Sequence, residues 1–385
     1  MSVGERQRVE ILRALAVARR VLILDEPTAV LTPQETDQLF AAIGRLRQQG
    51  LAVAFISHKL DEVSRLCDEV TILRHGRRVH HGPTAELTTD RMAELMVGQA
   101  LSPLRPARSL APASAPMPTL RLENVSAVDP ISNRRIEAVS LEVRPGEIVG
   151  IAGVEGNGQD LLAAIIVGLR RPSAGRLLID GHDVGRLGVR ERHQLGLAHV
   201  PADRQSQALV PTMNLVENLI LKDYTSPAFA RTGLIRWGRV DAQAAERLGR
   251  FDVRAGSTRT EARHLSGGNQ QKLVLARELG GSPRLIVAHN PVRGLDVAAT
   301  RFVFEQLLAQ RARGAAVLLI HSDLDELLGR SDRVAGMFRG RCLPADWPRC
   351  DRAAIGRLML LGTQTERRDG GPEATRECRK LDQAS

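Results

Sequence analysis

The feature that most constrains this chain is an internal repeat with an offset of 264 residues. When the sequence is slid along itself by that distance, Pro27 meets Pro291, Asp68 meets Asp332 and Gly76 meets Gly340. The match needs no gap across about 75 residues, and chance does not produce such a match. The chain is therefore predicted to hold two copies of one domain.

The two copies are predicted to differ in length. The Pro-, Ala- and Ser-rich stretch 99–118 is typical of a linker, so the domains are expected at residues 1–98 and 119–360. The polar residues 361–385 are expected to form a disordered tail. Only Met1 precedes the first copy's Ser2, whereas a long segment precedes its counterpart, Ser266. We therefore expect the first copy to lack about 145 residues at its front.

Composition argues against several classes of protein. The net charge is +10, but 50 of the 54 basic residues are arginines scattered along the chain, and only 3% of the residues are aromatic. This pattern favours solvated surface arginines over a platform for nucleic acid. No run of 18 apolar residues occurs, so no transmembrane segment is expected. The 4 cysteines lie far apart, which favours a reduced compartment and no zinc site.

Polar residues follow two predicted strands of the first copy. The apolar run Val21–Leu24 is typical of a buried parallel strand and leads into Asp25 and Glu26. The stretch 52–56 is predicted to be the next strand, and His58 follows it. Since open α/β sheets bind ligands at the carboxyl ends of their strands, these three side chains are candidate site residues.

A Gly-rich turn in the second copy has the spacing of a phosphate-binding loop. Gly153 and Gly158 occupy the glycine positions of G-x-x-x-x-G-K-[ST], after a predicted strand and before a predicted helix. In this motif, backbone N–H groups surround phosphates, the Lys reaches the outer phosphates and the hydroxyl holds Mg²⁺. Here Gln159 and Asp160 replace those two residues, and a plain strand–helix turn is the alternative interpretation.

Ser266-Gly267-Gly268 precedes a predicted helix at residues 269–279. A hydroxyl group and unpaired N–H groups at a helix N-terminus suit a phosphate group.

Together these segments resemble ABC-type ATPases. SVGERQRVEI (2–11) and LSGGNQQKLVLAREL (265–279) resemble the family's signature segments. VLILDEPTAVLTP (21–33) resembles its Walker B strand with the catalytic Glu, and FISHKLDE (55–62) resembles its switch-His segment. The paired arrangement is similar to the fused double ATPases of bacterial simple-sugar and nucleoside importers.

The resemblance implies an α/β P-loop NTPase fold, with one truncated copy and one near-complete copy, and ATP and Mg²⁺ as cofactors. It implies that Asp25 holds the Mg²⁺ hydration shell, that Glu26 orients or deprotonates the attacking water, and that His58 contacts the γ-phosphate. The implied ATP-binding residues are Ser2, Gly4, Gly153, Gly156, Asn157, Gly158, Gln159, Ser266, Gly267, Gly268 and Gln270.

The second copy has lost the residues that the family uses for hydrolysis. At the 264-residue offset, His289 replaces Asp25, Asn290 replaces Glu26 and Ser322 replaces His58. We therefore expect this copy to be unable to hydrolyse ATP. The first copy's catalytic residues should pair with Ser266 and Gly268 across an interface, but no P-loop lysine occurs anywhere in the chain.

The expected function is that of the ATP-binding subunit of an ABC importer for a sugar or nucleoside. The implied partners are two membrane permease subunits and a substrate-binding protein, with no nucleic acid, at the cytoplasmic face of the bacterial plasma membrane. The chain alone is expected to be inactive. One alternative is a non-catalytic remnant or regulatory subunit. Another is a soluble twin ATPase acting on the ribosome or DNA.

Overall fold

The computed structural model describes residues 9–11, 13–14, 20–28, 33–57, 59–74, 76–97, 117–154, 156–345 and 352–362. We call residues 20–97 the first lobe and residues 117–362 the second lobe. The predicted linker falls almost wholly outside these ranges. The predicted tail overlaps the last residue of helix α12 (Arg352–Leu361), and its residues 363–385 lie outside them.

The first lobe contains two small sheets and three α-helices among its described residues. Strand β1 pairs in parallel with β2, and β3 pairs antiparallel with β4. Leu22 and Leu24 of β1 pack against Leu39 and Ile43 of α2, so one face of the β1–β2 sheet is covered. The elements are β1 (Val21–Asp25), α2 (Pro33–Gln48), β2 (Ala52–Ile56), α3 (Leu60–Leu66), β3 (Glu69–Arg74), β4 (Arg77–Pro83), the 3-10 turn η1 (Thr84–Glu86) and α4 (Thr89–Val97).

The second lobe is built on a six-stranded sheet of order β10-β13-β14-β7-β15-β16. Its first five strands run parallel and β16 is antiparallel. The strands are β7 (Ile148–Gly153), β10 (Leu197–Val200), β13 (Leu285–His289), β14 (Ala316–His321), β15 (Arg333–Phe338) and β16 (Arg341–Pro344). Every residue of β7, β13 and β14 is buried, as expected for parallel strands covered on both faces.

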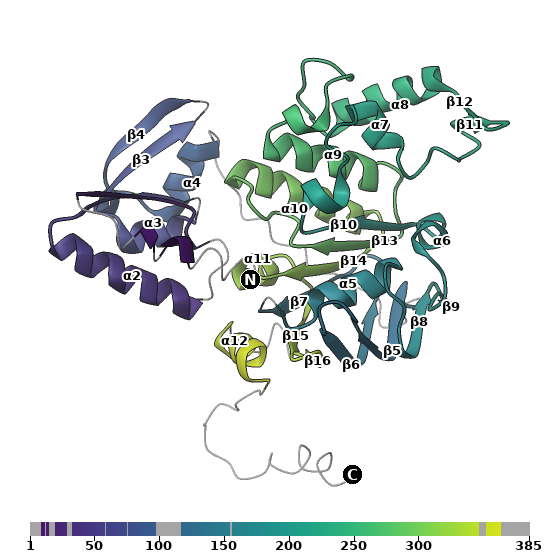
Figure 1. Ribbon diagram of the computed structural model, residues 1–385, viewed down its shortest axis with the longest axis horizontal. Coiled ribbons are helices and arrows are strands. Elements are labelled where there is room, and N and C mark those ends of the chain that lie inside the picture. Colours follow the sequence, from purple (N-terminus) through teal and green to yellow (C-terminus); the bar gives the residue numbers. More distant parts are fainter. Residues whose placement is uncertain are drawn as a thin grey trace, which may run out of the picture.

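Two layers cover the six-stranded sheet (Figure 1). On one side lie α7 (Leu215–Ile220), α8 (Trp237–Arg250), α9 (Gly267–Leu279) and α10 (Val297–Ala312). On the other side lies α5 (Gln159–Val167), with a four-stranded antiparallel sheet of order β6-β5-β8-β9. Those strands are β5 (Leu120–Val128), β6 (Arg135–Val143), β8 (Ala174–Ile179) and β9 (His182–Asp183).

Shorter elements complete the second lobe. They are α6 (Val189–Gln194), the π-helical turn η2 (Arg204–Ala208), the hairpin β11 (Ala230–Arg231) and β12 (Leu234–Ile235), the 3-10 turn η3 (Ala262–His264), α11 (Leu324–Leu328) and α12.

The elements of the first lobe recur in the second at the offset found in the sequence. Each of β1, α2, β2, β3 and β4 begins 264 residues before its counterpart, which is β13, α10, β14, β15 or β16. The strand register is also the same, since Val21 pairs with Ala52 and Leu285 pairs with Ala316. The backbone of the first lobe therefore follows the same course as that of residues 285–344.

Candidate functional site

The carboxyl end of β1 presents the two candidate acidic residues. Asp25 is the last residue of β1 and its side chain is exposed. Glu26 follows with a φ of 44°, in the left-handed region that non-glycine residues seldom adopt. The Glu26 N–H donates to the carbonyl oxygen of Ile56 at 2.9 Å, which ties this turn to the end of β2. Asp25 and Glu26 are therefore held at the sheet edge where α/β proteins bind ligands.

A polar network joins the turn after β1 to helix α3. The Thr28 hydroxyl donates to Glu62 Oε2 at 2.6 Å, and the Ser57 hydroxyl donates to the same oxygen at 3.3 Å. Lys59 Nζ lies 3.4 Å from Glu62 Oε1 and donates to the Thr28 carbonyl at 3.3 Å. The buried Glu62 thus holds Thr28, Ser57 and Lys59 together. His58 itself lies outside the described residues, as do Ser2 and Gly4.

Helix α9 begins at the predicted Ser-Gly-Gly segment, two residues earlier than the sequence indicated. Ser266 is its N-cap, and its hydroxyl accepts the N–H of Asn269 at 3.4 Å. The Arg204 side chain lies over this end, because a Cβ built on Gly267 would stand 2.7 Å from Arg204 Nη2. Gln270 is buried and donates to the Ala262 carbonyl at 3.1 Å. Its side chain is therefore occupied within the protein.

The Gly-rich loop of the second lobe is closed by its own side chains. Gln159 Nε2 donates to the Val154 carbonyl at 3.0 Å, folding the amide back over the loop. A Cβ on Gly153 would lie only 2.1 Å from that nitrogen, so a larger residue there would displace the Gln159 amide. Gly156 and Gly158 adopt φ values of 99° and 104°, which glycine accommodates most easily.

Asn157, also in this loop, is hydrogen-bonded to β15, the strand beside β7, and to helix α12. Its Nδ2 donates to the carbonyls of Met337 at 3.0 Å and Met359 at 3.2 Å. The N–H of Arg339 donates to its Oδ1 at 3.2 Å. The loop is thereby connected to β15 and to helix α12, and the Asn157 side chain is already fully engaged.

Asp160, at the start of α5, sits in an ion-paired cluster. Arg134 Nη1 donates to its Oδ2, and His289 Nε2 lies 3.4 Å from its Oδ1. His289 stands at the position of Asp25 in the repeat. The acidic side chain that the sequence placed at the phosphate loop is thus paired with Arg134. No short-range sequence pattern links Arg134 to this loop. Arg134 directly precedes β6, and the position of that strand places it beside Asp160.

The remaining counterparts of the catalytic residues are also engaged. Asn290, at the position of Glu26, has a φ of 42° and donates its N–H to the Ile320 carbonyl at 2.8 Å. Its Oδ1 accepts the N–H of Ser322, the counterpart of His58, at 2.9 Å. His321 is buried, and its ring lies 6.2 Å from that of Phe304. The only histidine next to this position therefore faces the core.

A buried charge cluster anchors the other end of α9. Burial alone would raise the pKa of Glu278, but Lys222, which donates to its Oε2, and Arg277, at 2.9 Å from its Oε1, lower that pKa to about 2. The N–H of His199 donates to Oε2 at 3.0 Å. Burial lowers the pKa of the His199 side chain to about 4, so it is neutral at pH 7. This cluster links α9 to β10 and to Lys222, two residues after the end of α7.

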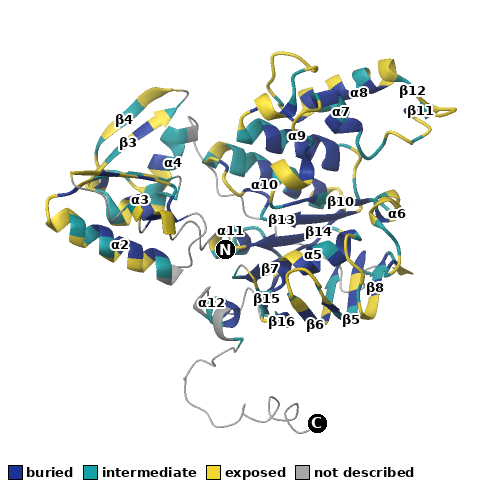
Figure 2. Cartoon of the chain, viewed as in Figure 1, coloured by how far each residue is buried: buried dark blue, intermediate teal, exposed yellow. Residues whose placement is uncertain are grey.

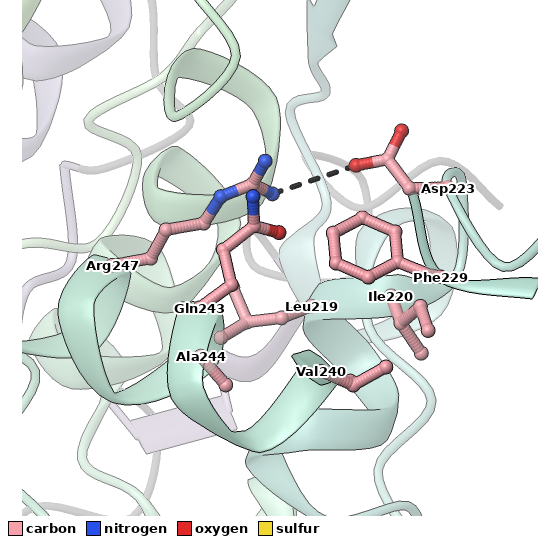
Figure 3. Close-up of a pocket in the computed structure, with 8 residues that line it drawn as sticks. All are labelled: Leu219, Ile220, Asp223, Phe229, Val240, Gln243, Ala244 and Arg247. Carbon is pink, nitrogen blue, oxygen red and sulfur yellow. Dashed lines mark ion pairs between the residues drawn. The ribbon is translucent and has the colours of Figure 1, made fainter. Parts of the chain in front are cut away.

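A small hollow lies between α7 and α8 (Figure 3), and no residue of the Gly-rich loop lines it. Its rim carries Arg247, whose Nη1 lies 3.5 Å from Asp223 Oδ2. A hydrogen bond with His193 is the largest cause that lowers the pKa of Asp223. The hollow is lined by Leu219, Ile220, Asp223, Phe229, Val240, Gln243, Ala244 and Arg247. Mostly apolar and with its charges paired, it does not have the donor set of a phosphate site.

The structure places the predicted site residues in two separate sheets. Asp25 and Glu26 belong to the β1–β2 sheet, whereas the Gly-rich loop follows β7 of the six-stranded sheet. Ser266, Gly267 and Gly268 form the start of α9. Among the described residues, the Gly-rich loop is present only in the second lobe. There Asp160, which follows the loop, contacts His289, the counterpart of Asp25.

No helix within the described ranges combines the length and apolar character that crossing a bilayer requires. Over the same ranges, no three His, Cys, Asp or Glu residues are grouped as a metal cage would need.

Known proteins resemble the chain over both lobes. The family model described as ABC transporter matches residues 1–29 and 136–293. The chain is 41% identical over 365 residues to the glucose import ATP-binding protein TsgD13 of Haloferax volcanii, covering 94% of this chain and 66% of that one. It is 36% identical over 367 residues to the nucleoside import ATP-binding protein NupA of Lactococcus lactis, covering 95% of this chain and 72% of that one.

A solved structure supports the fold. The ADP conformation of an ATP-binding cassette of an ABC transporter aligns with a TM-score of 0.50 at 20% identity, covering 64% of this chain and 96% of that one. The predicted α/β P-loop ATPase fold is thus confirmed, while the chain spans between 66% and 72% of the length of the two curated relatives above. Taken with the strand-end carboxylates, the Gly-rich loop and the capped start of α9, these matches show that the chain belongs to the ATP-binding proteins of ABC transporters.

Proposed function

We propose that this chain is the ATP-binding subunit of an ABC importer that couples ATP binding and hydrolysis to uptake of a sugar or nucleoside. The observation that carries the proposal is the β1 end, where a strained turn holds Asp25 and Glu26 beside the polar network of Glu62. The similar proteins include glucose, nucleoside, guanosine and ribose import proteins, and they support the two substrate classes.

In this proposal the first lobe supplies the chemistry of hydrolysis. Glu26 orients or deprotonates the attacking water, and His58 contacts the γ-phosphate. Ser266 and Gly268 of the second lobe bind that phosphate from across an interface, where the start of α9 offers N–H groups. The phosphate-binding loop that this site requires is absent from these 385 residues, because no G-x-x-x-x-G-K-[ST] motif occurs in them.

The second site is proposed to be non-catalytic. It would combine Ser2 and Gly4 with the Gly153–Gln159 loop, while His289 and Asn290 replace the two carboxylates. Gln159 offers no cation to a phosphate, and its amide is bound to the Val154 carbonyl. The paired Asp160 stands where a hydroxyl would hold the metal ion, so nucleotide would have to displace its ion pair with Arg134.

The donor chemistry fits Mg²⁺ in the first lobe only. Mg²⁺ is usually held by one or two carboxylates together with water and substrate phosphates, rather than by an all-protein cage. Asp25, an exposed carboxylate at a strand end, satisfies that requirement. His289 does not, because its imidazole is paired with Asp160. When bound, the ion would neutralise charge on the phosphates, and Asp25 would position it.

The proposed assembly contains two copies of the domain, at 1–98 and 119–360. The element bounds that recur at an offset of 264 residues support this division. The proposed partners are two permease subunits and a substrate-binding protein, at the cytoplasmic face of the plasma membrane. The segment from His199 to Asn214 is proposed to face a permease, and the cluster around Glu278 would connect this segment to α9.

A genetic uptake experiment tests this function. Cells that lack the gene should lose uptake of one radiolabelled solute among glucose, ribose and guanosine, and a plasmid that encodes this chain together with the missing phosphate-binding loop should restore it. Glu26→Gln should reduce the restored rate by about 100-fold, because general-base catalysis contributes at least that much. Glu69→Gln, at an exposed glutamate of the same lobe, is the control and should restore uptake fully.

Two results would count against the proposal. Normal uptake of all three solutes without the gene would exclude these substrates. Full restoration by Glu26→Gln would show that the first lobe does no chemistry and would favour a regulatory or remnant role.

A further inference from the structure

The hairpin β11–β12 projects from the edge of the second lobe (Figure 1). Arg231 pairs with Leu234, and the two residues between them, Thr232 and Gly233, adopt φ values of 50° and 82°. Two positive φ values in succession are typical of the type I′ turn, which closes two-residue hairpins. The chain therefore reverses abruptly at this tip.

The base of the hairpin is fixed to the body of the lobe. Phe229 directly precedes β11, is buried, and lines the hollow between α7 and α8 (Figure 3). The N–H of Arg236 donates to the Phe229 carbonyl at 2.7 Å, and the Arg236 guanidinium donates to the Pro227 carbonyl at 2.5 Å. Both ends of the hairpin are thus held, and its tip points away from the lobe.

Large apolar and aromatic side chains around this hairpin are exposed (Figure 2). Leu234 exposes 74% of its surface, and Trp237, the first residue of α8, exposes 43%. Tyr224, in the turn before the hairpin, is also exposed and is the only tyrosine in the sequence. Because only 3% of the chain is aromatic, this grouping stands out from the composition and indicates an interaction site.

The same segment is strongly basic. Residues 224–240 contain no Asp or Glu, and their cations are Arg231, Arg236 and Arg239. The acidic residues on either side, Asp223 and Asp241, are paired with arginines outside the segment, whereas Arg231 and Arg239 form no ion pair within the described ranges. Since residues that pair across a hairpin share a face, a free cation lies beside the exposed Leu234.

We propose that these residues form a binding site for the surface of an anionic lipid bilayer. We call the site the hairpin patch; it comprises Tyr224, Arg231, Leu234, Arg236, Trp237 and Arg239. Leu234 and Trp237 enter the boundary between headgroups and acyl chains, where tryptophan is favoured. Arg231 and Arg239 contact the lipid phosphates. Neither contact needs ATP, so the proposal goes beyond the importer assignment and does not depend on it.

The shape of the hairpin patch favours a bilayer over a folded protein. A specific protein interface buries about 800 Å² on each partner, and a projecting turn would need a matching hollow on the other side. A bilayer accepts a narrow tip at any point of its surface. It also supplies both an apolar phase for Leu234 and negative charge for the arginines.

Vesicle binding by the full chain tests the proposal. The sequence has 2 tryptophans, so Trp347→Phe leaves Trp237 as the only one. Its emission should shift to shorter wavelength with vesicles made of equal amounts of phosphatidylglycerol and phosphatidylcholine. Vesicles of phosphatidylcholine alone should cause no shift. Inorganic phosphate should cause none either, because it offers no apolar phase.

Co-sedimentation with the same vesicles measures the contribution of each kind of side chain. Arg231→Gln with Arg239→Gln should weaken binding by about 30-fold, since each arginine near an anionic surface contributes about fivefold. Leu234→Asn should weaken it by about fivefold, because binding scales with the apolar area that enters the interface. Circular dichroism checks that each variant is folded.

A matched pair of arginines controls for total charge. Arg171→Gln with Arg313→Gln removes the same charge from exposed positions outside the hairpin and should change the affinity by less than about twofold.

Four results would overturn the proposal. The first is no binding to the anionic vesicles, and the second is equal loss in both arginine pairs, which would mean that only total charge matters. The third is binding without a shift of Trp237 emission, which would place the lipid elsewhere on the chain. The fourth is full binding by the Arg231 and Arg239 double variant, which would leave the patch to a protein partner.

Discussion

Asp160 shows how the chemistry of one position depends on its neighbours. A carboxylate at a phosphate loop repels a nucleotide, but this one is paired with Arg134 and His289. It also lies in the first turn of α5, where the helix dipole favours a negative charge. Side chains of the protein therefore pair with the Asp160 carboxylate, at a position where the family motif would bind metal and phosphate.

Restoring the two motif residues tests this view of the second site. Gln159→Lys with Asp160→Thr should tighten binding of a fluorescent ATP analogue by at least about tenfold, or about 1.4 kcal/mol, because a cation replaces an amide and an ion pair no longer has to be broken. ATP turnover should not rise at this site, since His289 and Asn290 remain. Gln49→Lys adds the same charge at an exposed position and should leave binding unchanged. Equal affinities for all three proteins would contradict the prediction.

His321 makes the stability of the second lobe depend on pH. Burial lowers the pKa of its side chain to about 4, and the N–H of Asp323 donates to Nδ1 at 3.0 Å. Asp323 opposes the shift, while Arg330 and His289 add to it. Below the ordinary histidine pKa of about 6.5, the unfolded chain binds a proton that the folded chain does not. Stability is therefore complete above that pH and declines as the pH falls towards the folded pKa.

The expected loss for His321 between these two pH values is about 3 kcal/mol. Urea midpoints measured from pH 7 to pH 4.5 should show it. His199 has a similarly lowered pKa of about 4, so His321→Gln should remove only about half of the pH dependence. An unchanged slope in the variant would show that His321 accepts a proton without cost to the fold.

At the scale of elements, buried polar side chains define where helices end. Arg192 of α6 is fully buried, and its guanidinium donates to the carbonyls of Ile165, Ile166 and Val184. Ile165 and Ile166 lie in the last turn of α5, where carbonyl groups lack partners within the helix. Burial lowers the pKa of Arg192 to about 10, so it remains charged at pH 7 and caps α5 from another helix.

Removing this cap should destabilise the second lobe. Arg192→Ala leaves several buried carbonyls without a donor, and the expected loss is about 3 kcal/mol, measured as a lower urea midpoint. Arg190→Ala, on the exposed side of the same helix, should change stability by less than about 0.5 kcal/mol. A small effect of Arg192→Ala would show that water replaces the guanidinium.

The regular elements were largely predictable because their signals are local. The strands at Val21 and Ala52 and the helix start at Pro33 follow from apolar runs and turn residues. Helix α9 begins two residues earlier than expected, because Ser266 rather than a later residue caps it. The pairing of Arg134 with Asp160 could not be predicted, since it depends on how β6 is placed against α5.

At the scale of the whole molecule, the two lobes differ in how completely they are packed. The central strands β7, β13 and β14 of the second lobe are buried on both faces, whereas β1, β2 and β3 have exposed residues along one face. Stability scales with the apolar surface that folding removes from water. The first lobe should therefore be the weaker unit.

Unfolding of the full chain should accordingly proceed in two steps. Hydrogen exchange followed by mass spectrometry in increasing urea should show peptides of β1 and β2 losing protection first, with those of β13 and β14 protected to higher urea. The equivalent strands thus serve as internal controls for one another. A single transition shared by both sets of peptides would contradict this expectation and would mean that the lobes unfold as one cooperative unit.

The turn that follows β1 and β13 has a consequence for how the two copies diverged. Both turns place a non-glycine residue at positive φ, and each is held by the same backbone bond to the neighbouring strand. Asparagine tolerates that conformation better than glutamate does. The turn at Asn290 is therefore the less strained of the two, whereas Glu26 is held with a local strain of about 1 kcal/mol. The second copy thus has the turn that folds more easily, with Asn290. The first copy keeps the reactive Glu26 at the cost of backbone strain.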